Sequence, residues 1–214
     1  MIDLHTHTLF SDGVLVPAEH LRRFAVMGYE AVAITDHADS SNLDFIVPRI
    51  VRAAKDLNPF SSTKLIPGIE LTHIPPELFH PLTVRARELG ARIVVAHGET
   101  PVEPVITGTN KAALEAGVDI LAHPGFLTEE EAILAAQKQI LLELSGRKGH
   151  SLTNGHVARM AVKAGAKMAV NADAHEPGDF MTSERAEIVA LGAGLTVEQY
   201  QQLRRDMAEL ARKL

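Results

Sequence analysis

The sequence contains no cysteine and no tryptophan, and it has few aromatic residues of any kind. Without cysteine there can be no disulfide and no thiolate-bound metal, so any metal site must use nitrogen and oxygen ligands. Because aromatic residues make up only 4% of the chain, we do not expect a stacking platform for bases or sugars. The chain also lacks an 18-residue apolar run and a basic, then apolar, leader segment. We therefore expect a cytoplasmic location and no membrane partner.

Positive charge is in deficit as well. The chain has 21 Lys and Arg against 27 Asp and Glu, a formal net charge of −6. A long nucleic acid is therefore not expected as a partner, because phosphate backbones select basic surfaces. With 214 residues, 46% of them hydrophobic, the chain is predicted to form one domain spanning residues 1–214 with a full core. The oligomeric state is not indicated.

Short apolar runs alternate with amphipathic stretches along the whole chain. This alternation predicts repeated strand–helix units and a parallel sheet. A standard eight-stranded barrel takes about 250 residues, so a seven-stranded barrel suits this length better. The seven predicted strands are Met1–Leu4, Glu30–Ile34, Lys64–Ile69, Arg92–Ala96, Asp119–Ala122, Gln139–Leu144 and Lys167–Asn171.

Local signals place several of the helices between these strands. A proline start and a glycine stop predict a helix over Pro17–Met27. Thr128 and Thr196 each open a capping box, the second ahead of a C-terminal helix. A helix in the Asp44–Leu57 region is expected to begin at or just before Pro48, and prolines after His73 predict a broken or late helix there.

The 11 histidines are the one unusual feature of the composition. Six of the seven predicted strands end in a histidine or a carboxylate, and such strand ends form one face in parallel α/β folds. Imidazoles and carboxylates gathered there would be costly to bury without a cation. One ion cannot use all these donors and keep an open position, whereas two or three ions can, with Glu70 as a bridge. The predicted ligands are His5, His7, Asp12, His37, Glu70, His97, His123, Asp173 and His175.

With these motifs in place, the sequence resembles the PHP family, named for polymerase and histidinol phosphatase. The resemblance implies a distorted seven-stranded (β/α) barrel that carries a trinuclear metal site at its C-terminal face. The resemblance extends over the whole chain. Its motifs are His5-Thr-His7 with Ser11-Asp12-Gly13, Thr35-Asp36-His37, Gly68-Ile-Glu70, His97, His123-Pro124 and Asp173-Ala-His175.

The resemblance also implies how the ligands are shared among the ions. One metal would take His5, His7, Glu70 and Asp173. A second would take Glu70, His97 and His123, and a third Asp12, His37 and His175. Some family members have histidine where this chain has Asp12. A carboxylate is a harder ligand than an imidazole, so zinc is not the only ion expected. We therefore expect two to three divalent ions, with zinc, manganese and iron all open.

The family is mostly phosphoesterases, so the resemblance implies attack of a metal-bridging hydroxide on phosphorus. Glu70, His37 and Asp36 are the predicted catalytic groups. Asp36 either orients a neighbouring ligand or water or caps a loop. Arg147 and Lys148, after the sixth strand, are the predicted phosphate-binding residues. The expected substrate is a small phosphorylated metabolite, a phosphomonoester similar to histidinol phosphate.

Several alternatives stay open. The chain could be a phosphodiesterase, a nucleotide phosphatase or an exonuclease, or a metal-binding barrel without catalysis. An amidohydrolase is disfavoured because those barrels have eight strands and lack the Gly-Ile-Glu70 pattern. His20 and His80 are expected on helix surfaces, whereas His150 and His156 are either leaving-group acids or simply exposed. The loop after His97 is a candidate lid.

Overall fold

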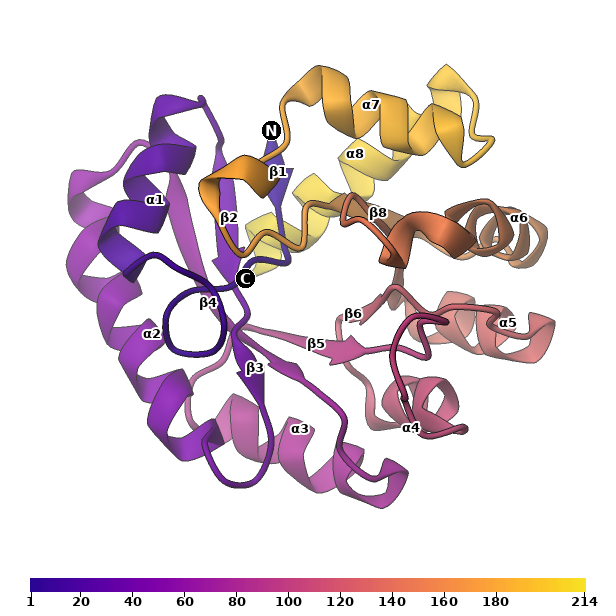
Figure 1. Cartoon of the computed structure of the whole chain (residues 1–214), viewed down its shortest axis with the longest axis horizontal. Helices are drawn as coiled ribbons and strands as arrows, with labels where there is room; N and C mark the ends of the chain where they lie inside the picture. Colours follow the sequence, from indigo (N-terminus) through magenta and orange to yellow (C-terminus); the bar gives the residue numbers. More distant parts are fainter.

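The computed structural model describes residues 1–214 as a ring of parallel strands with helices around it (Figure 1). Seven strand positions follow one another in chain order, each paired in parallel with the next. They are β1 (Ile2–Asp3), β2 (Ala31–Ile34), β4 (Lys64–Leu71), β5 (Ile93–His97), β6 (Ile120–Ala122), β7 (Leu141–Ser145) and β8 (Met168–Asn171). This confirms the predicted α/β barrel of seven strands.

Two short stretches complete the ring. The strand β3 (His37–Ala38) was not predicted; it continues the line of β2 and also pairs with β4. The first and last strands meet at a single bridge, where Thr6 lies opposite Ala174 and the His7 amide donates to the Ala174 carbonyl at 2.8 Å. The barrel is therefore nearly closed, and its weakest seam lies beside the residues that follow β1 and β8.

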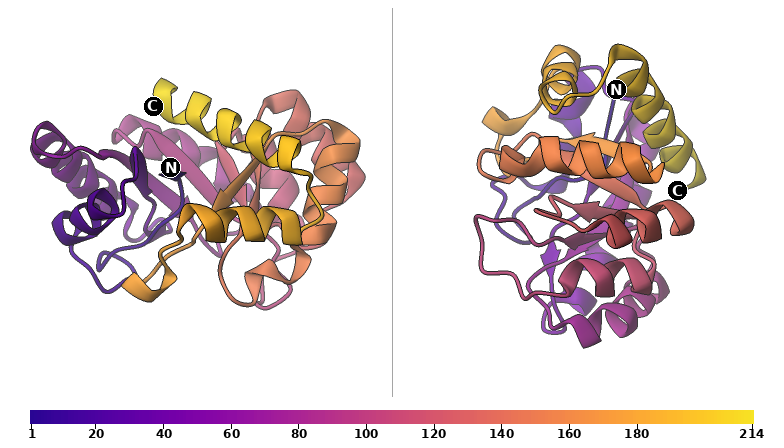
Figure 2. Two further views of the ribbon diagram at one scale, coloured as in Figure 1. Left: turned by 90° about the horizontal axis from the view of Figure 1, so that it is seen from above. Right: turned by 90° about the vertical axis from the view of Figure 1, so that its right-hand side faces the viewer.

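Eight helices surround the strands. They are α1 (Pro17–Val26), α2 (Leu43–Leu57), α3 (Phe79–Glu88), α4 (Thr109–Ala116), α5 (Glu129–Lys138), α6 (Asn154–Ala164), α7 (Ser183–Gly192) and α8 (Val197–Lys213). Figure 2 shows α7 and α8 side by side at the C-terminal end of the chain. None of the helices has the length and apolar character needed to cross a membrane.

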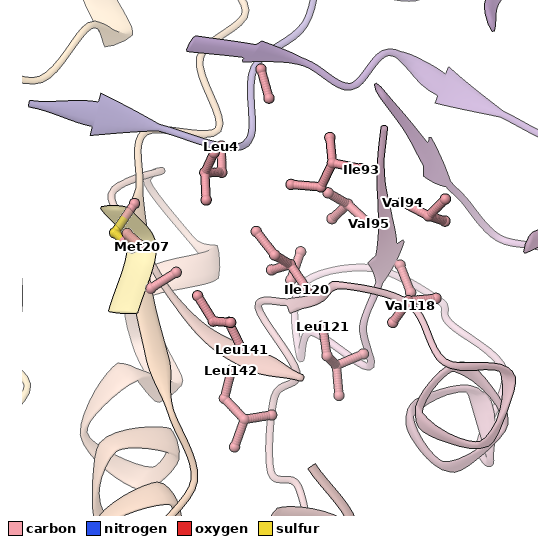
Figure 3. Close-up of a cluster of buried hydrophobic side chains, with 14 of the residues drawn as sticks. Leu4, Ile93, Val94, Val95, Val118, Ile120, Leu121, Leu141, Leu142 and Met207 are labelled. Carbon is pink, nitrogen blue, oxygen red and sulfur yellow. The ribbon is translucent and has the colours of Figure 1, made fainter. Parts of the chain in front are cut away.

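Helix α8 covers the N-terminal end of the barrel. Near its own end, its carbonyl groups accept hydrogen bonds from Lys64 and Arg92, which lie at the start of β4 and just before β5. Met207 of α8 joins the same buried cluster as Leu4 (Figure 3). One end of the barrel is thus closed by a helix, and the C-terminal ends of the strands are left for the polar groups.

The inner face of the barrel changes from apolar to polar along each strand. Ile93 and Val95 are fully buried among the barrel side chains (Figure 3), and strand alternation puts His97 on their side. Gly68 and Glu70 share a side of β4 in the same way. A side chain at Gly68 would collide with Ile93, so the glycine leaves room for the apolar layer below Glu70.

The helix signals were mostly confirmed. Both capping boxes form, at Thr128 and Thr196, and α3 begins late, at Phe79 after a short 3₁₀ turn. The expected start of α2 at Pro48 was wrong, because the helix begins at Leu43 and contains Pro48. The proline costs one intrahelical hydrogen bond, which burial of the apolar face from Leu43 to Ala54 outweighs.

Candidate metal centre

The floor of the site is formed by side chains from β4 and from the residues that directly follow β1, β6 and β8. His5 Nε2 lies 3.3 Å from Glu70 Oε1, and His7 Nε2 lies 3.2 Å from Asp173 Oδ1. His123 Nε2 lies 3.7 Å from Glu70 Oε1. All five side chains are buried. The predicted convergence of these strand ends therefore produces one enclosed group of three imidazoles and two carboxylates, which we call the floor cluster.

Several polar atoms of the floor cluster have no hydrogen-bond partner. They are His5 Nε2, His7 Nδ1, His7 Nε2, Glu70 Oε1 and His123 Nδ1. Buried polar groups are normally paired, and each unpaired one costs about 1–3 kcal/mol. Nitrogen and carboxylate oxygen donors left facing one another fit divalent cations, and His5, His7 and Glu70 form one compact donor triad.

The other side of the site is more open. Asp12 Oδ1 lies 3.2 Å from His175 Nε2 and 3.6 Å from His37 Nε2. The exposed side-chain fractions are 56% for Asp12, 26% for His37 and 11% for His175. These three residues form the rim cluster. It is joined to the floor by the 2.6 Å contact between His37 Nδ1 and Glu70 Oε2.

His97 and His123 meet a third imidazole that the sequence left undecided. His150 is buried, and its ring stacks on that of His123 at 4.1 Å between centroids. The ring nitrogens of His97, His123 and His150 lie close enough to share one ion. Glu70 does not form such a set with His97. The exposed alternative for His150 is therefore wrong: the 3₁₀ turn over His150–Thr153 directs it into the site.

Glu143 is a site residue that the sequence reasoning missed. It is fully buried on β7, where Oε1 lies 2.8 Å from His5 Nδ1 and Oε2 accepts from the His123 amide at 3.1 Å. Asn171 donates to the same carboxylate at 2.9 Å. Glu143 therefore fixes the ring of His5 so that Nε2 faces Glu70. The available signal was a lone carboxylate within an otherwise apolar strand.

Asp36 lies beneath the loop that carries Asp12. Its carboxylate accepts from the amides of Thr8 and Ser11 at 2.7 and 3.2 Å and from both of their hydroxyls at 2.7 Å. These contacts fit the loop-capping alternative. Asp36 thus positions the rim cluster through the backbone of the His7–Asp12 loop.

The two predicted phosphate-binding cations differ in placement. Arg147 lines a small polar cavity with His37 and Asp173, and its Nη1 lies 2.8 Å from His175 Nδ1. Lys148 is exposed and borders a neighbouring shallow depression that also includes Asp12. Arg147 therefore lies at both hollows, whereas Lys148 borders only the outer one, beside Asp12 and His175.

The buried charges of this cluster shift the pKa values of its imidazoles in opposite directions. Burial works against a charged His5, but the carboxylates of Glu143, Glu70 and Asp173 outweigh it and raise the His5 pKa well above its ordinary value. Burial and a neighbouring imidazolium lower the pKa values of His7 and His123 well below theirs. Adjacent imidazoles thus cannot all carry protons, and a neutral imidazole is the form that can bind a metal ion.

Backbone strain is concentrated at the same place. Of the four non-glycine residues with positive φ, three lie at or near the site: His73 at 53°, His123 at 28° and Asp173 at 52°. Such conformations cost about 1–3 kcal/mol each and persist where the surroundings enforce them. His123 and Asp173 are therefore held in orientations that their own backbones disfavour.

The remaining histidines lie outside the floor cluster. The surface prediction for His20 was wrong: the side chain is buried, with Nε2 2.9 Å from Thr6 Oγ1 and its ring against Phe24. His80 is exposed, as expected. His156 Nε2 lies 2.8 Å from the Leu127 carbonyl, so His156 connects α6 to the loop ahead of α5.

Comparison with known proteins identifies the family. Residues 3–187 match the family model described as the PHP domain. The chain belongs to the PHP family. Members of this family are metal-dependent hydrolases, which agrees with the unpaired donors of the floor cluster. The family predicted from the strand-end motifs is thus confirmed.

Two relatives show the range within the family. The chain is 47% identical over 196 residues to the uncharacterized protein MJ1295 of Methanocaldococcus jannaschii, covering 91% of this chain and 90% of the relative. It is 29% identical over 171 residues to the 5'-3' exoribonuclease Rnm of Salmonella typhimurium, covering 80% of this chain and 51% of the relative. This chain therefore spans about half the length of that exoribonuclease.

Solved structures share the fold at low sequence identity. A histidinol phosphate phosphatase from Lactococcus lactis, determined with zinc, L-histidinol and phosphate, superposes with a TM-score of 0.62 at 16% identity over 91% of this chain and 94% of that chain. An ochratoxinase from A. niger gives 0.63 at 14% identity over 95% and 69%. The barrel alone does not distinguish between their reactions.

Proposed function

We propose that the protein is a metal-dependent phosphoesterase that hydrolyses a small phosphomonoester similar to histidinol phosphate. The observation that carries this proposal is the floor cluster with its unpaired donors, beside a wholly polar cavity lined by Arg147. The structural likeness to a phosphatase with bound zinc and phosphate supports it. The expected partner is a phosphorylated metabolite of the cytoplasm.

The donors are sufficient for two to three ions. His5, His7, Glu70 and Asp173 would hold one ion in the floor cluster. His97 and His123 would hold a second, and the rim cluster a third. When bound, such ions lower the pKa of water and neutralise the oxygens of a phosphoryl group. The Asp12 carboxylate favours harder ions, so manganese and iron are included with zinc.

The protein groups have separate tasks in this proposal. Arg147 binds the phosphoryl group, since a guanidinium can donate two parallel hydrogen bonds to two of its oxygens. Its contact with His175 already directs Nη1 toward the cavity. His37 holds Glu70 in place from the cavity side through the 2.6 Å contact. Asp36 keeps the loop of Asp12 closed around the rim, which makes it a positioning residue.

The test is phosphate release from a panel of esters. The protein is stripped of metal and reloaded with manganese, zinc or iron, then given histidinol phosphate, nucleoside mono- and bisphosphates, and a diester. Fast release from one small monoester, lost in His37→Ala, supports the proposal. A protein that binds two or more ions and hydrolyses none of the esters would refute it.

A second candidate is a nuclease acting on short oligonucleotides. The observation that favours it is the 29% identity to the exoribonuclease. The net charge of −6 opposes a long polymer as substrate. The panel separates the two candidates: turnover of the diester without the monoesters favours the nuclease, and the reverse favours the phosphatase.

A further inference from the structure

One carboxylate in the site comes from a loop and belongs to none of the predicted ligand sets. Glu103 lies in the connection between β5 and α4, flanked by Pro101 and Pro104. Most residues of the loop tip, 101–107, are exposed, but Glu103 is turned inward and lines the polar cavity. A charged side chain on an exposed loop would ordinarily be hydrated, so contacts within the site stabilise the inward orientation of Glu103.

Three imidazoles surround the carboxylate of Glu103. Its Oε2 lies 3.0 Å from His73 Nε2 and 3.1 Å from His97 Nε2, and its Oε1 lies 3.4 Å from His150 Nε2. Two ligands of one ion, each about 2.0–2.2 Å from it, lie about 3.0–3.5 Å apart. The spacing of these atoms therefore fits donors around a shared cation, and His73, His97 and Glu103 form one compact triad.

The orientation of His97 directs its Nε2 toward the Glu103 carboxylate. Its Nδ1 lies 3.2 Å from the Gly98 carbonyl, which can only accept a hydrogen bond, so Nδ1 carries the proton. In the neutral ring that binds metals, Nε2 then presents a lone pair to a carboxylate oxygen that also presents lone pairs. Two acceptors facing each other repel unless a proton or a metal ion lies between them, so a metal ion bound here would take the place of the Nε2 proton.

His73 is held toward the same point at a cost. It lies just beyond β4 with φ at 53°, a conformation that a side-chain-bearing residue rarely adopts. This backbone turn brings its ring within 4.8 Å of the His97 ring. Since its Nε2 approaches Glu103, the strained conformation adds a third donor to the pair.

We propose that Glu103 is a loop-carried metal ligand. It binds the ion held by His97, with His73 as an additional donor, while the site contains no substrate. The Glu103 carboxylate lines this cavity, so an anionic phosphoryl group that entered it would meet a like charge. The phosphate of the substrate therefore displaces Glu103, a step that rests on the function proposed above.

The loop is built for a displacement limited to its tip. Glu99 Oε1 accepts from the amides of Gly108 and Asn110 at 2.9 and 3.0 Å, which fixes the two ends of the loop together. Asn110 also donates to the Pro124 carbonyl at 2.8 Å. The anchored base leaves residues 101–107 as the part that can carry Glu103 into and out of the site.

The experiment compares Glu103→Gln with Glu130→Gln, a matched change at an exposed position on α5. Stripped protein is titrated with manganese, with bound ions counted by elemental analysis and free Mn²⁺ followed by electron paramagnetic resonance. Loaded protein is then titrated with inorganic phosphate. For Glu103→Gln we expect one ion to bind about tenfold more weakly or worse, and phosphate to bind several-fold more tightly. Glu130→Gln should match the wild type in both titrations.

The expected result is specific because manganese binding weakens while phosphate binding tightens. A misfolded site would weaken the binding of both ions. Unchanged manganese affinity in Glu103→Gln would overturn the ligand assignment, even if phosphate bound more tightly. Weaker phosphate binding would overturn the displacement. His73→Gln should weaken the same ion by a smaller factor. The manganese titration needs no ester, so it remains decisive if no phosphoester is hydrolysed.

Discussion

The floor and rim clusters contain the same kinds of side chain but stand in different surroundings. The floor cluster is buried on every side, and Glu143 and Asn171 support it from below. The rim cluster is partly exposed, with the Asp12 side chain 56% accessible, and it is held by a loop. An unpaired charge is costly in the buried floor cluster. In the rim cluster, water can replace a lost partner at a smaller cost. The floor is thus suited to hold ions permanently, and the rim to exchange ligands with substrate.

The largest effect should come from Glu70, which joins the two clusters. Glu70→Ala removes contacts to His5 and His37 and leaves their imidazoles without a shared carboxylate. We expect loss of at least one ion and a fall in turnover of about 10³-fold or more, since several kcal/mol of transition-state stabilisation depend on the metals. Metal counting and phosphate release check this, with Glu88→Ala on α3 as the control. Normal metal content in the variant would contradict the account.

Loss of the side chain that supports the floor cluster from below should lower metal affinity less than loss of a ligand, but still by a measurable amount. In Glu143→Ala, His5 loses the group that orients its ring, and the His123 amide loses its acceptor. We expect metal affinity to fall about 10- to 100-fold with the barrel still folded. Titration of stripped protein with zinc measures this, and circular dichroism verifies the fold. If zinc binds as in the wild type, the floor does not depend on Glu143.

A change at the rim should separate substrate binding from metal binding. Arg147→Met keeps the length of the side chain and removes its charge. We expect a rise in KM for the phosphomonoester of about 10- to 100-fold, equivalent to a lost charge-assisted hydrogen bond, with the ion count unchanged. Lys148→Met, at the neighbouring exposed position, should change KM little. Loss of ions in Arg147→Met would show that the rim and the floor are not separable in this way.

The smallest effect on activity is expected at His20, which is buried but lies outside both clusters. Burial lowers its pKa from 6.5 to about 4 in the folded protein. The unfolded chain therefore takes up this proton first, and stability falls as pH drops from about 6.5 toward 4, by up to about 3 kcal/mol. Urea unfolding of the stripped protein at pH 7 and pH 5 should show a smaller loss for His20→Gln than for wild type. Equal losses would mean that His20 is protonated when folded.

The strand ends were predictable because two simple rules act together there. Apolar runs mark the strands, and the residue that breaks each run marks where the chain reaches the C-terminal face. The structure accordingly brings all nine predicted donors, from His5 to His175, to one face. Their roles as ligands remain a prediction.

The unpredicted parts of the site depend on packing that the local sequence does not encode. Glu143 lies within β7 rather than after its end, so a lone carboxylate inside the strand was the only signal. Glu103 reaches the site through the path of a loop that no periodicity describes. His20 was assigned to the surface because helical spacing does not show that the Thr6 hydroxyl lies behind α1.

The most direct test of the central claim is to count the ions bound per chain while following phosphate release from the monoester panel. Stripped protein is reloaded stepwise with manganese, and the two quantities are measured on the same samples. The account predicts two to three ions per chain, with release beginning only once the floor is filled. Saturation at one ion, or full occupancy with no ester hydrolysed, would contradict it.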